Sequence, residues 1–324
     1  MKAAFFTDTP SNVDYVYAKG RREQVAGITE LYPEIITDAN FEQHLPALHD
    51  LDVIFSTWGM FPLTEKQLDG LPALKAVFYG AGATDHFARV FLQRGIKVIS
   101  AWQANAIPVA EFATAQILLS LKGFFRNTRE FKSREKWTRA TEGAFVGPGV
   151  FEEKVALIGA GAIAQKTREL LARHDIEVIV IPSRQEKRTI SLEEAFKTAF
   201  VISNHLPNRE DNQGVIKGRH FRLMRPGAVF INTGRGAQVD ETEMIAVLKE
   251  RPDLTVLLDV TWPEPPETDS DLYRLPNVHL SSHIAGSIGN EVVRMADFVI
   301  ADYQRFVAGE PLQYEVTESM LMTS

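Results

Sequence analysis

Short apolar runs alternate with amphipathic stretches over the first hundred residues. Five of these runs have the length of strands: Lys2–Phe6, Glu34–Ile36, Val53–Ser56, Leu74–Phe78 and Lys97–Ser100. Phe41–Leu48 and Thr64–Leu71 have helical patterns, and Thr64 can cap the second helix because Gln67 follows at the position of a capping box. Strands that alternate with helices of this length predict parallel βαβ units.

A long helical pattern, Val109 to about Lys132, follows this first set, and we predict that it connects two domains. A turn is expected at Gly143–Gly149. Six further runs are apolar on consecutive residues: Val155–Ile158, Val178–Ile181, Phe200–Ser203, Ala228–Asn232, Thr255–Val260 and Val278–Leu280. Such runs are typical of strands covered on both faces, as in a doubly wound parallel sheet. A last helix is predicted at about Ile288–Val307, ended by Gly309 and Pro311.

Composition narrows the classes of protein that are possible. The chain has 324 residues, 45% of them hydrophobic, which suits two globular domains rather than a disordered or repetitive protein. Its formal net charge of -7 lacks the electrostatic footprint of a general nucleic-acid binder. With 0 Cys there are no disulfides, thiolate metal sites or cysteine nucleophiles, and we expect no metal. Charges interrupt every apolar stretch before about 18 residues, so we expect a cytoplasmic protein without a membrane partner.

A glycine-rich loop follows the first run of the second set. Gly159, Gly161 and Ala164 form a Gly-x-Gly-x-x-Ala pattern between a predicted strand and a predicted helix. The first glycine permits a tight turn, the second lets backbone approach a pyrophosphate, and a small third residue allows close packing. The helix N-terminus would then offer N–H groups to the pyrophosphate. The loop predicts dinucleotide binding, although a glycine-rich turn in any α/β protein is the alternative.

The next strand ends without the carboxylate that usually binds the ribose 2′-hydroxyl of NAD(H). Ser183 and Arg184 stand there instead, followed by Lys187 and Arg188. Arg184 could bind a 2′-phosphate through two donors and Ser183 through a third, which favours NADP(H) over NAD(H). A solvated basic loop without cofactor preference is the other interpretation.

Three more segments end predicted strands, where open α/β sheets bind ligands. They contain Arg235, Glu264 and His283. Singly, each residue has an ordinary explanation: a surface cation, a loop carboxylate and a structural histidine. Their order and surroundings resemble the D-isomer-specific 2-hydroxyacid dehydrogenase family over nearly the whole chain. The segments that carry the resemblance are 105–111, 159–164, 205–207, 224–236, 259–265 and 283–286.

The resemblance implies two Rossmann-like, doubly wound α/β domains, the substrate domain being discontinuous: residues 1–103 and 288–324, with the dinucleotide-binding domain at 104–287. It implies that Arg235 anchors the carboxylate and carbonyl of a 2-keto acid, that His283 is the acid/base and that Glu264 is its partner. Such a carboxylate would favour the imidazolium form and hold the ring. Further cofactor contacts follow from the same resemblance: Ala162, Ile163, Leu206, Pro207, Thr233, Asp259 and Gly286. Asp259 could instead be a structural hydrogen-bond acceptor.

The substrate is expected to be small. The loop that contains Trp58 and Met60 has neither Lys nor Arg, whereas a phosphorylated acid would favour a basic residue there. Trp58 could contact the substrate or belong to the core. Ala81 and Gly82 lie in a glycine-rich turn that resembles the family's substrate turn, and a tight structural turn is the alternative for them.

Three other functions remain open at this stage: a dinucleotide-sensing, corepressor-like binding protein, a 3-phosphoglycerate dehydrogenase, and an oxidiser of formate or phosphite on the same scaffold. An intact set of Arg235, Glu264 and His283 favours an NAD(P)-dependent oxidoreductase acting on a D-2-hydroxy acid. A homodimer, formed through the connector helix and the segment around Trp137, is implied by resemblance alone.

Overall fold

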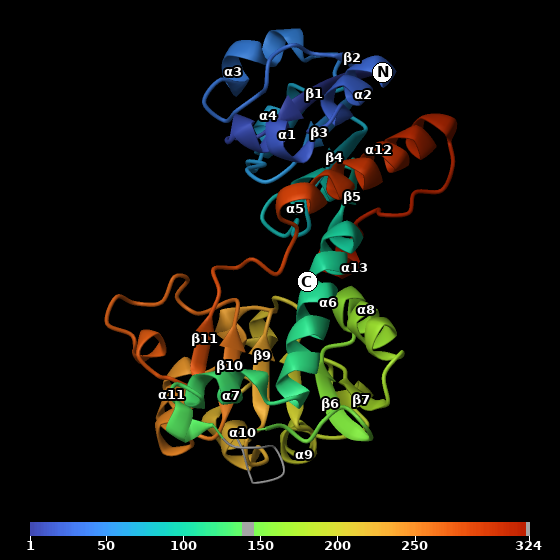
Figure 1. Cartoon of the computed structure of the whole chain (residues 1–324). Helices are drawn as coiled ribbons and strands as arrows, with labels where there is room; N and C mark the ends of the chain where they lie inside the picture. Colours follow the sequence, from blue (N-terminus) through green and yellow to red (C-terminus); the bar gives the residue numbers. More distant parts are fainter. Residues whose placement is uncertain (138–145, 322–324) are drawn as a thin grey trace. The chain divides into compact units, whose positions relative to one another are not determined.

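The computed structural model describes residues 1–137 and 146–321, which fall into two compact units (Figure 1). Unit 1 comprises Met1–Asn105 and Ser287–Ser324, and unit 2 comprises Ala106–Gly286. The predicted turn at 143–149 lies partly outside the described residues.

Unit 1 is built on a five-stranded parallel sheet of order β2-β1-β3-β4-β5. Its strands are β1 (Lys2–Phe6), β2 (Glu30–Leu31), β3 (Val53–Ser56), β4 (Ala76–Tyr79) and β5 (Lys97–Ser100). Its helices are α1 (Pro10–Val16), α2 (Arg21–Ile28), α3 (Phe41–His44), α4 (Glu65–Asp69), α5 (Ala88–Gln93), α12 (Val293–Ala308) and α13 (Glu318–Leu321). Thr64 caps α4 in the predicted capping box.

Alternate residues of the unit 1 strands enter two separate cores. Ala4 and Phe6 of β1 pack into one core, whereas Ala3 and Phe5 pack into the other. Because side chains alternate across a strand, the two cores lie on opposite faces of the sheet. Residues of α12 belong to the second core, so the segment after Ser287 covers one face of a sheet made by the first hundred residues.

Unit 2 contains a six-stranded parallel sheet of order β11-β10-β9-β8-β6-β7. Its strands are β6 (Glu153–Ile158), β7 (Ile176–Ile181), β8 (Val201–Asn204), β9 (Val229–Asn232), β10 (Thr255–Leu258) and β11 (Val278–Leu280). Its helices are α7 (Phe124–Glu130), α8 (Ala162–Leu171), α9 (Leu192–Thr198), α10 (Gly218–Leu223), α11 (Glu241–Glu250) and most of α6 (Trp102–Leu121). The strand order reverses between β6 and β8, the position at which open α/β sheets bind ligands.

The structure corrects three of the predicted elements. Glu34–Ile36 is not a strand: β2 ends at Leu31, before Pro33, and Ile36 forms only an isolated bridge with Phe6. The connector starts at Trp102, with Pro108 inside it, and Gly123 in a left-handed conformation separates α6 from α7. The final helix starts at Val293 rather than Ile288.

Helix α6 also changes the expectation about apolar length. Over the described ranges it is the one helix long and apolar enough, by length and composition, to cross a membrane, and 50% of its apolar window is buried inside the protein. Ile117 and Leu121 of this helix belong to the core of unit 2. Core helices pass the same test of length and composition.

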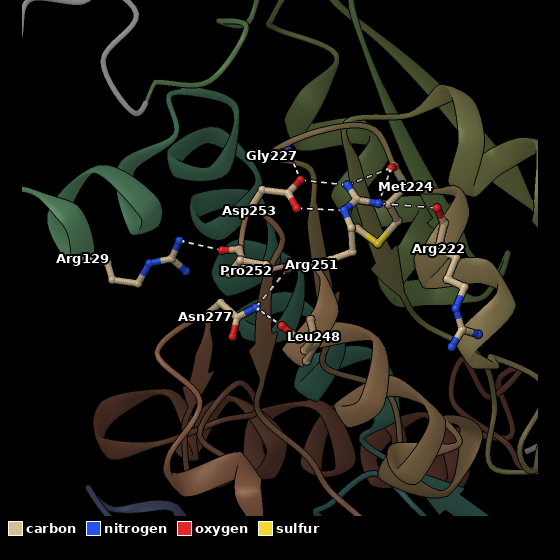
Figure 2. Close-up of polar contacts among 9 residues, drawn as sticks. All are labelled: Arg129, Arg222, Met224, Gly227, Leu248, Arg251, Pro252, Asp253 and Asn277. Atoms are coloured by element: carbon tan, nitrogen blue, oxygen red, sulfur yellow. Dashed lines mark hydrogen bonds and ion pairs between the residues drawn. The ribbon is translucent and has the colours of Figure 1, made fainter.

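A group of polar contacts joins the turns at the amino ends of β9, β10 and β11 (Figure 2). Arg251 forms a bidentate ion pair with Asp253, with both nitrogen–oxygen distances at 2.8 Å, and Asp253 accepts a hydrogen bond from the Gly227 N–H at 3.0 Å. The Arg251 guanidinium holds the pKa of Asp253 below its usual range. Asn277 donates to the Leu248 carbonyl at 3.1 Å. These contacts fix the end of the sheet opposite to the candidate site.

Candidate active site

The dinucleotide loop has the geometry that its glycines predict. Gly159 has a φ of +115°, and a Cβ there would lie 2.4 Å from the His205 carbonyl oxygen, so no larger residue fits. Gly161 precedes α8 without a side-chain cap, and a Cβ on it would meet nothing within 4 Å. The first N–H groups of α8, from Ala162 and Ile163 on, have no side-chain cap, and the backbone at Gly161 is open to the approach of a pyrophosphate. These residues fit a dinucleotide.

The loop after β7 contains Ser183 and Arg184, as expected. Arg188 donates to the carbonyls of Pro182 and Ser183 at 2.9 and 2.8 Å, so its guanidinium shapes the loop. Ser183 Oγ lies 3.5 Å from a guanidinium nitrogen of Arg209, which comes from the loop after β8. The sequence gives no signal for Arg209, because the two loops are adjacent in space and distant in the chain.

A buried amide network connects the loops after β8 and β9. Asn204 Nδ2 donates to Gln238 Oε1 at 2.6 Å and to Asn232 Oδ1 at 3.0 Å. Gln238 Nε2 donates to the carbonyls of Leu206 and Pro207 at 2.9 Å each. All three amide side chains are buried. The network fixes the predicted cofactor residues Leu206 and Pro207. Asn204 and Asn232 are visible in the sequence as polar residues that end apolar strands, whereas Gln238 does not end a strand.

Arg235 follows β9, and the same network holds its backbone. Its N–H donates to Gln238 Oε1 at 3.2 Å, and its carbonyl accepts from Asn232 Nδ2 at 3.1 Å. Gly236 follows without space for a side chain, since a Cβ would lie 2.0 Å from the Thr261 carbonyl carbon. The guanidinium is half-buried and donates to the Gly234 carbonyl at 2.8 Å. Its remaining donors can bind an anion.

Glu264 and His283 form a direct pair. The distance from His283 Nδ1 to Glu264 Oε1 is 2.7 Å, and both side chains are exposed, at 49% and 39% respectively. Because Nδ1 is bound to the carboxylate, Nε2 is the ring nitrogen that can exchange a proton with a ligand. Glu264 follows β10, which pairs with β9, the strand before Arg235, and His283 follows β11, which pairs with β10 on its other side. The three predicted residues thus end three adjacent strands.

Asp259 is buried, and its carboxylate holds the His283 loop. It accepts hydrogen bonds from Ser281 Oγ at 2.6 Å and from the N–H groups of Ile284 and Ala285 at 2.9 Å each. His283 itself has a φ of +57°, and its N–H donates to the Asp259 carbonyl at 2.9 Å. These bonds favour the structural interpretation of Asp259. Gly286 ends unit 2 directly after this loop.

Two titratable groups beside the site have shifted pKa values. Burial lowers the pKa of His205 to about 4, so its ring is neutral at pH 7. The ring nitrogens lie 2.9 Å from Ser203 Oγ and 3.5 Å from Thr233 Oγ1. Burial also raises the pKa of Glu241 to about 7, and its carboxylate accepts a hydrogen bond from the Trp262 N–H at 2.6 Å. Glu241, which contacts the loop that contains Glu264, was not predicted from the sequence.

The candidate substrate residues Trp58, Ala81 and Gly82 belong to unit 1. Trp58 is half-buried against both cores of that unit, and its carbonyl accepts from Thr7 Oγ1 at 2.9 Å. The Ala81 and Gly82 carbonyls both accept from Ser100 Oγ, at 2.8 and 2.7 Å. Ala81 is fully buried, so only the backbone of this turn can meet a ligand. Within the described ranges, no group of three or more His, Asp or Glu residues could hold a metal ion.

Comparison with known proteins defines the class to which this architecture belongs. The model of the D-isomer specific 2-hydroxyacid dehydrogenase NAD binding domain matches residues 114–285. The chain therefore belongs to the D-isomer-specific 2-hydroxyacid dehydrogenase family, as the sequence predicted, and unit 2 is its nicotinamide dinucleotide-binding domain.

Individual relatives share a third or less of their aligned residues with this chain. The chain is 32% identical over 204 residues to the putative 2-hydroxyacid dehydrogenase YoaD of Bacillus subtilis, covering 60% of this chain and 59% of that protein. It is 26% identical to a D-3-phosphoglycerate dehydrogenase of Archaeoglobus fulgidus, covering 73% of this chain and 46% of that one. It thus spans about half the length of these two relatives. The structure of D-mandelate dehydrogenase from Rhodotorula graminis shares the fold, with a TM-score of 0.78 at 20% identity over 98% of both chains.

Proposed function

We propose that this protein is an NAD(P)-dependent oxidoreductase that transfers a hydride between NADP(H) and a small 2-keto or 2-hydroxy acid of D configuration. The observation that carries the proposal is the 2.7 Å pair of His283 and Glu264, which together with Arg235 follow the three consecutive strands β11, β10 and β9 of one sheet. Membership of the family supports the class of reaction.

Each protein group has a distinct task in this reaction. Arg235 binds the substrate carboxylate and the C2 oxygen through the planar fork of its guanidinium. In reduction, protonated His283 gives the Nε2 proton to the C2 oxygen as the C2 carbonyl bond becomes a C–OH bond; in oxidation, neutral His283 takes that proton back. Glu264 holds the ring and stabilises its protonated form. The bound cofactor supplies or accepts the hydride at C2.

Substitution of the acid/base pair tests the proposal. His283→Ala should lower kcat by about 10²–10⁴-fold, the usual worth of general acid–base catalysis, while the Kd for NADPH stays unchanged. Glu264→Gln keeps a hydrogen bond to Nδ1 but removes the charge, so its loss of kcat should be smaller than that of His283→Ala. The loss should be greatest in the direction of reduction, which requires protonated His283. Arg235→Lys should mainly raise KM, because the ammonium cannot bind bidentately.

A substrate panel distinguishes the proposed substrate class from phosphorylated acids. Glyoxylate, hydroxypyruvate, pyruvate, a branched 2-keto acid and phosphohydroxypyruvate should be assayed with NADPH and with NADH. Efficient reduction of one of the first four supports the proposal, and activity restricted to phosphohydroxypyruvate would instead favour a 3-phosphoglycerate dehydrogenase. Tight cofactor binding without turnover of any of these acids would favour a dinucleotide-sensing protein.

We also propose that the protein is a homodimer. Phe124, Phe131 and Trp137 have 45%, 48% and 56% of their surface exposed, which is unusual for large apolar side chains. Sedimentation velocity should give a dimer that Phe131→Glu converts to a monomer, and a monomeric wild-type protein would contradict this proposal.

A further inference from the structure

The carboxyl end of the sheet contains a second arginine beside the predicted ribose 2′ position. The side chain of Arg209 is 11% exposed, with Nη1 3.5 Å from Ser183 Oγ. Arg209 and Ser183 come from the loops after β8 and β7, the two strands that flank β6 and its dinucleotide loop. Side chains from both loops therefore meet beside the end of β6.

Arg209 is already bound to an anion, the carboxylate of Asp211. Arg209 Nε donates to Asp211 Oδ1 at 2.7 Å, and Nη2 pairs with the second carboxylate oxygen. This bidentate arrangement is also the one in which a guanidinium binds two oxygens of a phosphate. The Asp211 side chain is 65% exposed and can move away, whereas Arg209 is held by its surroundings.

The other cations of the corner have different surroundings. Arg188 already donates hydrogen bonds to the carbonyls of Pro182 and Ser183, so its guanidinium stabilises the conformation of the loop. Arg184 is exposed and close enough to Asp211 to help lower the pKa of that carboxyl group. An anion in the place of the Asp211 carboxylate would thus be close to Arg184, Arg209 and the Ser183 hydroxyl.

We propose that Arg209 is a specificity-determining residue, whose guanidinium exchanges the Asp211 carboxylate for the ribose 2′-phosphate of NADP(H). The inference rests on the proposed function and deepens it, because it names the group that selects the cofactor. Asp211 keeps the arginine oriented in the absence of the phosphate, and it competes with the phosphate when the cofactor binds.

Nucleotide fragments test this inference without any catalytic step. The full chain is titrated by calorimetry with 2′,5′-ADP and with 5′-AMP, which differ only in the 2′-phosphate. The wild-type protein should bind 2′,5′-ADP at least tenfold more tightly. Arg209→Leu should weaken 2′,5′-ADP by about 10–100-fold, the worth of a charge-assisted bidentate contact, and 5′-AMP by less than about twofold. Arg209→Lys should be intermediate.

Asp211→Asn provides a test of opposite sign. Removal of the competing carboxylate should tighten 2′,5′-ADP several-fold and leave 5′-AMP unchanged. Arg219→Leu is the matched control, because Arg219 also pairs with a carboxylate, Glu193, at 3.3 Å, but lies on α10. It should alter neither affinity. Circular dichroism establishes that each variant is folded.

Two results would overturn the inference. If Arg209→Leu weakens both fragments equally, or neither, the arginine does not read the 2′-phosphate. If Asp211→Asn weakens 5′-AMP, the carboxylate binds the ribose hydroxyls and the corner is built for NAD(H). In either case the dehydrogenase proposal stands as long as NADH or NADPH supports turnover of a keto acid; failure of both dinucleotides to bind would reject the proposed function as well.

Discussion

Removal of the Asp259 carboxylate should destabilise unit 2 and disable His283 together. Asp259→Ala deletes the acceptor for three hydrogen bonds, from Ser281 Oγ and from the N–H groups of Ile284 and Ala285. The first two donors can turn to water, so each bond is worth about 1 kcal/mol. Ala285 is 3% exposed, and its unpaired N–H costs about 1–3 kcal/mol more. The expected loss of unfolding free energy is therefore about 3–5 kcal/mol.

The effect on activity follows from the backbone of His283. A φ of +57° is unfavourable for a residue other than glycine, and the bonds to Asp259 keep the loop in that conformation. Once they are lost, the imidazole moves relative to the substrate, and we expect kcat to fall by about 10²-fold. Asp259→Asn can still accept one bond and should give smaller losses of both quantities.

Urea unfolding followed by circular dichroism measures the stability, and hydrogen exchange of the segment 281–287 reports the Ala285 N–H directly. Ser191→Ala is the control, because it removes the N-cap of α9. Ser191 Oγ accepts a hydrogen bond from the Glu194 N–H at 3.1 Å. It should cost about 1 kcal/mol and leave kcat unchanged. A loss below about 1 kcal/mol for Asp259→Ala, with normal kcat, would contradict this role of the Asp259 carboxylate.

Three other perturbations have defined outcomes. Burial raises the pKa of Glu241 from 4.5 to about 7, so between these pH values the folded state binds a proton that the unfolded state has lost, and stability should fall as pH rises from about 4.5 to 7. In urea unfolding, Glu241→Gln should flatten this dependence of stability on pH, and an unchanged slope would contradict the assignment. Gly236→Ala places a Cβ 2.0 Å from the Thr261 carbonyl carbon, so the Arg235 loop must shift and kcat/KM should fall at least tenfold, while a fully active variant would be contrary to this geometry. Gln238→Leu leaves buried carbonyls unpaired and should cost about 2–4 kcal/mol in thermal unfolding, with a raised KM for the keto acid; Gln238→Glu, which keeps the shape, serves for comparison.

The apolar runs predicted most strands because a doubly wound sheet buries both faces of each strand. Val155–Ile158 and Ala228–Asn232 overlap β6 and β9 for this reason. The same criterion was wrong for Glu34–Ile36, where burial of Ile36 comes from core packing and not from membership of the sheet. The connector helix was predicted from Val109, whereas α6 begins at Trp102 and contains Pro108.

Some residues of the candidate site could be predicted from the sequence, because a local requirement or a chemical role explains why that residue type stands there. The positive φ of residue 159 requires a glycine, and Glu264 and His283 are a carboxylate and an imidazole that can form a hydrogen-bonded pair. Arg209 and Gln238 were not accessible, because their roles come from contacts between loops that are distant in the chain. Their environment exists only once β7, β6, β8 and β9 are assembled into one sheet.

The discontinuity of unit 1 sets an order of maturation during synthesis. Unit 2 is a continuous stretch of 181 residues, Ala106–Gly286, that can close its core as soon as it leaves the ribosome. On one face of the first sheet, α1 and α2 contribute Val13, Val16 and Val25 to the core, but that core stays incomplete until α12 has been made. A chain interrupted after Gly286 would thus keep a dinucleotide-binding module but expose Phe55 and Phe78 to aggregation.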